Sequence, residues 1–219
     1  MAKKTPLPDT GFFILNDRYV LLDDFLPGLQ DRTVELDLGC GKGDFAVALA
    51  SRFPDRVVLA ADVMLGRLRK VVRKSRSEGN GGAPLDNLFF LRVEARHLLS
   101  IILPDSSLDR LHILCPDPWP KFKHKGHRLI SSDFVAQIAR VLKPGGVFHF
   151  STDDVPYLNA ASRNVETSGL FLPAESGAPA DVADIRTEFE TQWLAQGKSV
   201  THRVWRIRQL PTVSCSGGA

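Results

Sequence analysis

The sequence is poor in cysteine, with only Cys40, Cys115 and Cys215 among 219 residues. So few and so widely spaced cysteines exclude a disulfide framework or a metal cluster and favour a reducing compartment. The sequence also lacks an apolar run long enough to span a bilayer, and no apolar stretch follows the basic start as in a signal peptide. We therefore expect a cytoplasmic protein with no metal and no membrane partner.

A large excess of charge is also missing. The net charge is +3, hydrophobic residues make up 43% and charged residues 24%, as in ordinary folded domains. The length fits one domain, with an N-terminal extension over 1–32, a catalytic core over 33–210 and a flexible tail over 211–219. Basic residues instead gather in 67–76, 121–128 and 198–208, a distribution that suits nucleic-acid contact.

Strand and helix patterns alternate along the core. Apolar runs predict strands over 33–38, 57–61, 88–93, 108–114 and 147–150, with amphipathic helices between several of them. This order predicts an α/β fold with a Rossmann-like, doubly wound, mostly parallel sheet. A loop is expected over 173–184, and residues 186–210 should then return to the sheet.

An acidic residue lies at or near the end of each of these strands. Asp37, Asp62, Glu94, Asp117 and Asp153 lie at or near five successive strand ends. Ligands of such sheets bind beyond the carboxyl ends of the strands. The five carboxylates are therefore expected to converge on one crevice.

The glycine turn after the first strand predicts the cofactor. Gly39, Gly41 and Gly43 let the backbone approach a ligand, but their spacing differs from that of dinucleotide-binding loops. Asp37 would repel a phosphate and attract the ammonium group of a methionine moiety. Asp62 is suited to ribose hydroxyls and Glu94 to an adenine amine, which together indicate S-adenosyl-L-methionine. Each carboxylate alone also fits a solvated strand end or a helix cap.

The segment after the fourth strand predicts the substrate side. Two prolines stiffen the backbone around Asp117, and Trp119 offers an aromatic face to a base. The basic run 121–128 suits an RNA phosphate backbone, whereas the Arg67–Arg76 cluster equally fits the solvated face of a helix. The alternative for the segment is a proline-rich turn with a core tryptophan.

Three ordered motifs make the chain resemble the bacterial tRNA (guanine-N7)-methyltransferase family over nearly all of residues 33–208. They are Pro116–Trp119 with a basic stretch ending at Arg128-Leu129, Thr152-Asp153 with Tyr157, and Thr187–Glu190 with Gly197 and Trp205. The chain departs from the family at Asp62 and Glu94, where Glu and Asp or Asn are frequent, and at Gly126, where a basic residue is common.

The resemblance implies a class I methyltransferase that transfers a methyl group from S-adenosyl-L-methionine to guanine N7 in tRNA, at the variable-loop guanosine of tRNA position 46. It implies cofactor contacts from Asp37, Asp62, Glu94 and Asp117, with Asp117 central to catalysis, while Gly39 and Gly41 complete the cofactor loop. The guanosine would be contacted by Lys121, Asp153, Thr187, Glu188, Phe189 and Glu190. The sequence leaves open whether the protein is a monomer or a homodimer.

Four other functions are compatible with parts of the pattern. The Asp-Pro-Pro-Trp-like segment also occurs in enzymes that methylate exocyclic amines of adenine or cytosine, and Cys115 would serve covalent cytosine methylation. A non-catalytic RNA-binding protein and a dehydrogenase share the fold class.

Overall fold

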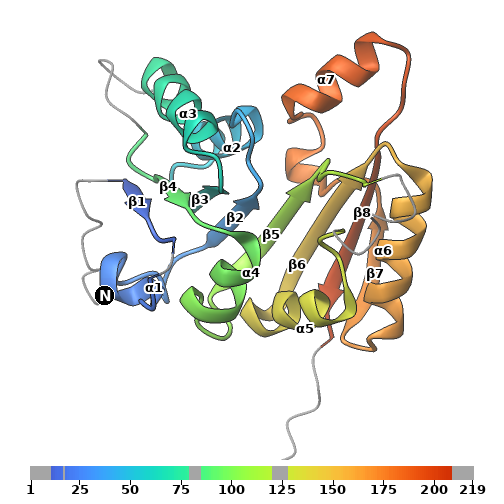
Figure 1. Ribbon diagram of the computed structural model, residues 1–219, viewed down its shortest axis with the longest axis horizontal. Helices are drawn as coiled ribbons and strands as arrows, with labels where there is room; N and C mark the ends of the chain where they lie inside the picture. Colours follow the sequence, from blue (N-terminus) through green and yellow to red (C-terminus); the bar gives the residue numbers. More distant parts are fainter. Residues whose placement is uncertain (1–10, 17, 79–84, 120–127, 209–219) are drawn as a thin grey trace, which may run out of the picture.

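The computed structural model describes residues 11–16, 18–78, 85–119 and 128–208, which form one eight-stranded sheet in the order β1-β4-β3-β2-β5-β6-β8-β7 (Figure 1). The strands are β1 Phe12–Ile14, β2 Val34–Leu38, β3 Val57–Asp62, β4 Leu88–Arg92, β5 Leu108–Leu114, β6 Leu142–Thr152, β7 Phe171–Ser176 and β8 Thr201–Ile207. The helices are α1 Leu22–Phe25, α2 Asp44–Arg52, α3 Leu65–Glu78, α4 Ala95–His97, η2 Leu98–Ile102, α5 Ser132–Val141, α6 Val155–Thr167, η4 Ala180–Val182 and α7 Glu188–Ala195.

The sheet is mostly parallel, as the alternation of strands and helices predicted. The pairs from β1 to β6 are parallel, and β8 runs antiparallel to both β6 and β7. The final segment therefore returns to the sheet as expected. The fold prediction, a Rossmann-like α/β sheet, is confirmed.

The prediction of a loop over 173–184 was wrong in its first part. Residues Phe171–Ser176 form the edge strand β7, in which Pro173 pairs with Trp205 of β8. An edge strand tolerates proline because one side of its backbone needs no ladder hydrogen bond. Composition alone therefore gave the appearance of a loop.

Two apolar layers sandwich the sheet. On one face Phe45 of α2 and Val71 of α3 pack against Val58 of β3. The opposite face packs against α5, α6 and η2, and Leu22 of α1 belongs to that core. Because side chains alternate along a strand, Glu35 and Asp37 of β2 lie on the α2 face while Leu36 lies on the other.

The predicted site lies at the carboxyl edge of this sheet. In Figure 1, α7 lies beyond the arrowhead of β5, at the top of the view. None of the helices within the described residues is both long and apolar enough to cross a membrane.

Candidate functional site

The glycine turn between β2 and α2 faces open space. Gly39 and Gly41 have φ values of +79° and +58°, and the amides of Gly39 and Cys40 donate to the Ala61 carbonyl at 2.8 and 3.0 Å. A Cβ at Gly39 would meet no atom of the described residues within 4 Å. The turn is thus fixed to the end of β3 while its outer side leaves room for a ligand.

Gly43 has a different role from the two glycines before it. A Cβ there would lie 2.3 Å from Cγ1 of Val71, so the glycine lets α2 and α3 pack closely. It caps α2 with a φ of +78°.

The carboxylates of Asp37 and Asp62, here called the acidic floor, lie beside this turn. The Oδ2 atom of Asp37 is buried and accepts no hydrogen bond from the described residues. Burial, followed by the charge of Asp62, raises the pKa of Asp37 to about 7. Asp62 accepts from the amides of Gly41 at 3.2 Å and Met64 at 2.7 Å. A buried carboxylate oxygen without a partner, beside an open glycine turn, fits a cofactor that carries positive charge.

Glu94 caps a helix at the neighbouring strand end. Its Oε2 atom accepts from the His97 amide at 2.9 Å at the start of α4. The amide of Val93 donates to the Asp62 carbonyl at 3.3 Å. Glu94, the next residue, therefore lies beside Asp62 at the same edge of the sheet. Its side chain is exposed.

The segment after β5 carries two strained residues. Cys115 and Trp119 have φ values of +50° and +42°, a region that non-glycine residues rarely occupy and that recurs at functional sites. Between them, exposed Asp117 accepts from the Trp119 amide at 3.2 Å. Lys121, Gly126 and the rest of 120–127 lie outside the described residues.

The basic run 121–128 was predicted to contact RNA phosphates, but Arg128 has a structural role instead. Its side chain is buried, donates from Nε to the Pro118 carbonyl at 2.8 Å and lies 4.8 Å from the centre of the Tyr157 ring. It also pairs with Asp154, the N-cap of α6, at 3.5 Å. Arg128 therefore fixes the Asp117 segment to α6, and a local charge pattern could not reveal its burial.

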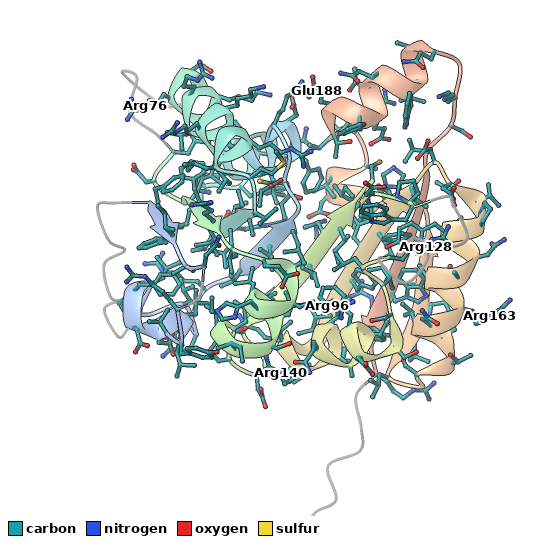
Figure 2. The ribbon with its side chains drawn as sticks, viewed as in Figure 1. Arg76, Arg96, Arg128, Arg140, Arg163 and Glu188 are labelled. Atoms are coloured by element: carbon teal, nitrogen blue, oxygen red, sulfur yellow. The ribbon has the colours of Figure 1, made fainter. Side chains whose placement is uncertain are left out.

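The Thr187–Glu190 motif opens α7. Thr187 caps the helix by accepting from the Glu190 amide at 3.1 Å, and Phe189 is 51% exposed. Glu188 pairs with Lys42 of the glycine turn at 2.5 Å, and Figure 2 shows it on the side of α7 that faces α2. The ion pair joins the predicted cofactor and substrate segments.

Cys115 lies where the strand-end motifs meet. Its Sγ is 3.6 Å from Oγ of Ser151, and Thr187 lies near enough to influence the pKa of the thiol. Burial raises the pKa of the Cys115 thiol, and the charges of Glu190 and Asp153 raise it further. A thiol held protonated is a poor nucleophile, which argues against covalent cytosine methylation. Asp153 itself is exposed directly after β6.

A buried polar chain was missed at the level of sequence. Glu35, His112 and His149 are buried on neighbouring strands and are linked by hydrogen bonds that continue to His202 and Glu190. Single polar residues inside otherwise apolar strands were the available signal. Their connection depends on strand register, which the sequence does not give.

Comparison with known proteins decides the family. A family model described as "Putative methyltransferase" matches residues 31–203. A tRNA (guanine-N(7)-)-methyltransferase of Syntrophotalea carbinolica is 35% identical, over 86% of this chain and 81% of that protein. A protein of the same name from Paracoccus denitrificans is 32% identical, over 82% of this chain and 74% of that protein. The chain belongs to the tRNA (guanine-N7)-methyltransferase family.

Solved structures show the same fold for this family member. The 16S rRNA methyltransferase KamB matches with a TM-score of 0.62 at 20% identity, covering 82% of this chain and 90% of that one. The aminoglycoside resistance methyltransferase NpmB1 matches with a TM-score of 0.58 at 19% identity, covering the same shares of the two chains. The chain is a methyltransferase of the class I fold, and the dehydrogenase alternative is set aside.

Proposed function

We propose that this protein transfers a methyl group from S-adenosyl-L-methionine to N7 of a guanosine in tRNA, at the variable-loop guanosine of tRNA position 46. One observation carries the proposal: the open glycine turn, with the unpartnered buried oxygen of Asp37 beside it, lies on the same sheet edge as Asp117. The names of the relatives, tRNA (guanine-N(7)-)-methyltransferase, support the substrate. A tRNA substrate would place the protein in the cytoplasm.

The cofactor would be held by the acidic floor and the turn. Asp37 would face its cationic part, Asp62 its ribose hydroxyls and Glu94 its adenine amine, with Gly39 and Gly41 leaving room for close approach. Two backbone amides already orient the Asp62 carboxylate in the folded protein. Binding of the cofactor therefore needs to order this side chain little further. The cofactor supplies a methyl group on a positively charged sulfur.

The guanosine would lie between Asp117 and the start of α7. Guanine N7 has a lone pair in the neutral base, so attack on the methyl carbon needs no prior removal of a proton. The bond from N7 to the methyl carbon forms as the carbon–sulfur bond breaks, and the positive charge moves onto the base. The protein therefore contributes alignment and electrostatic stabilisation rather than acid–base chemistry.

The acidic groups around Cys115 are suited to stabilise the positive charge that moves onto the base. Asp117 and Asp153 would hold the amine and imino hydrogens of the base and stabilise its developing charge. Glu190 and Thr187 would border the same point, which is supported by their influence on the pKa of Cys115. Lys121 and Phe189 would complete the contacts, Lys121 to the RNA and exposed Phe189 to a base face.

The test is Asp117→Asn, assayed by labelled methyl incorporation into unmodified tRNA. We expect kcat to fall by at least about a hundredfold, because a neutral amide cannot stabilise the cationic base. Asp133→Asn on α5, an exposed carboxylate away from the site, is the matched control and should keep wild-type turnover. Normal turnover by Asp117→Asn, with cofactor affinity unchanged by calorimetry, would overturn the assignment.

A further inference from the structure

A continuous chain of hydrogen bonds crosses the sheet beneath the candidate site. Glu35 Oε2 faces His112 Nε2 at 2.9 Å, and the Nδ1 atoms of His112 and His149 are 3.0 Å apart. His149 Nε2 faces His202 Nδ1 at 2.9 Å, and His202 Nε2 faces Glu190 Oε1 at 3.1 Å. The chain runs from β2 through β5, β6 and β8 to the first turn of α7.

This series of hydrogen bonds needs one more proton than three neutral imidazoles carry. Four hydrogen bonds link the two carboxylates through three imidazoles, and each bond requires one proton. Three neutral imidazoles supply three protons, because each has one N–H and one lone pair. If the series held only three protons, one of the four contacts would have no proton. Two lone pairs would then face each other in a buried site.

Glu35 fixes the direction in which the chain donates. It accepts from Arg56 at 2.6 Å, and Arg110 lies 3.5 Å away, which favours an ionised carboxylate. Burial alone would raise the pKa of Glu35, but the hydrogen bonds from His112 and Arg56 and the charge of Arg110 hold it below its usual value. His112 must then donate from Nε2, so its Nδ1 accepts from His149, whose Nε2 accepts from His202 Nδ1.

The fourth proton therefore belongs at the other end. Burial lowers the pKa values of His112 and His149, and at His112 it outweighs the raising effect of the bond and charge of Glu35. The charge of Arg110 lowers both pKa values further, so neither inner ring takes a second proton. At the Glu35 end, Arg56 and Arg110 balance the charges of Glu35 and Asp181. One added proton at Glu190 and His202 leaves the buried network neutral as a whole.

We propose that this protein stores one proton between His202 and Glu190, and that His202 and Glu35 are positioning residues for Glu190 at the guanosine site. The inference rests on the proposed function only for the guanosine contact of Glu190. As positive charge develops on the base, the O–H bond of Glu190 can break and an N–H bond can form on His202. The O–H electron pair then stays on the carboxylate and places negative charge beside the base.

Nuclear magnetic resonance of the ligand-free, ¹⁵N-labelled full chain tests the proton directly, without RNA or cofactor. We expect His112 protonated on Nε2 alone, His149 on Nδ1 alone, and His202 protonated on Nδ1 with Nε2 sharing a proton. His149 protonated on Nε2, or His202 with an unshared Nε2 lone pair, would overturn the proposal. The spectrum does not depend on whether the protein methylates tRNA. Failure of the proton proposal can therefore be distinguished from failure of the proposed function.

Glu35→Gln gives a sharper version of the same test. The amide oxygen stays on Arg56, and its NH₂ then donates to His112 Nε2, which reverses every bond in the chain. His112 should become protonated on Nδ1, His149 on Nε2 and His202 on Nε2, and no fourth proton is needed. Glu166→Gln, an exposed change on α6, should leave all tautomers as in the wild type. Unchanged tautomers in folded Glu35→Gln would contradict the proposal.

The positioning role has its own measurement in the pH dependence of kcat. Loss of the fourth proton at high pH sets a His202 lone pair against ionised Glu190 in the wild type, whereas Glu35→Gln keeps an N–H there. The ratio of wild-type to Glu35→Gln kcat should therefore fall as the pH is raised. Cys115, whose thiol pKa is raised by the charges of Glu190 and Asp153, is the same in both proteins. A constant ratio with reversed tautomers would refute the positioning role.

Discussion

Arg128 donates from its Nε to the carbonyl oxygen of Pro118 at 2.8 Å, and this bond ties the Asp117 segment to the rest of the protein. The guanidinium also lies over the Tyr157 ring and beside Asp154, the cap of α6. The strained backbone at Trp119 is thus held from the side of α6.

Arg128→Lys is expected to lower kcat by about tenfold while leaving cofactor affinity unchanged. Lysine keeps the charge but cannot bond Pro118 and Asp154 while stacking on Tyr157. Steady-state kinetics with tRNA and calorimetry with the cofactor measure the two effects. Arg163→Lys on the exposed side of α6 (Figure 2) is the control and should match the wild type. Equal kcat values in the two variants would show that Arg128 does not position the segment.

Asp37 makes stability depend on pH in a direction that can be worked out. Its pKa is raised to about 7 in the folded protein, so folding favours the protonated form. The free energy of unfolding should therefore fall as pH rises from about 4 to about 7, by roughly 4 kcal/mol at most, and stay low above that. Asp37→Asn should remove this dependence in denaturant titrations of the ligand-free protein. A variant with the wild-type pH dependence would assign the effect to another group.

Binding of a cationic cofactor should show the opposite trend. Since only ionised Asp37 attracts the cation, wild-type affinity relative to Asp37→Asn should increase by about tenfold between pH 6 and pH 8. Using the ratio of the two Kd values cancels any titration of the cofactor itself. A ratio independent of pH would mean that Asp37 does not face the cofactor charge.

The glycines of the turn should separate stability from binding. Gly43→Ala places a Cβ against Val71 and should cost about 2–4 kcal/mol in the free energy of unfolding. The Cβ of Gly39→Ala has no neighbour within 4 Å in the part of the chain that the structure describes, so the change should cost only about 1 kcal/mol, while weakening cofactor binding. Adding Val71→Ala to Gly43→Ala should recover part of the loss. No recovery in this double-mutant cycle would exclude the steric explanation.

Cys115→Ala should retain kcat within about threefold of the wild type. The thiol is held protonated by burial and by nearby acidic charge, so it serves packing and the contact with Ser151 rather than attack on a base. Methyl transfer to tRNA by this variant is the measurement. Complete loss of transfer, in a variant that still folds and binds the cofactor, would revive the covalent mechanism.

The fold and the strand-end carboxylates could be predicted because both follow from local patterns. Apolar runs located β2 to β5, and parallel strands bring their carboxyl ends to one edge, so Asp37 and Asp62 were found from sequence. The long-range contacts around Asp117 and Glu190 could not be predicted in this way. Arg128 is buried by Tyr157, and the histidine chain depends on the register between β5, β6 and β8. Long-range packing decides both.

Identification of the methylated nucleoside tests the central claim most directly. Unmodified tRNA would be incubated with the full chain and labelled S-adenosyl-L-methionine, digested to nucleosides, and analysed by mass spectrometry, with the position mapped on the intact tRNA. We predict 7-methylguanosine at position 46 of the variable loop. N6-methyladenosine, N4-methylcytidine or unmodified tRNA would contradict the proposed function.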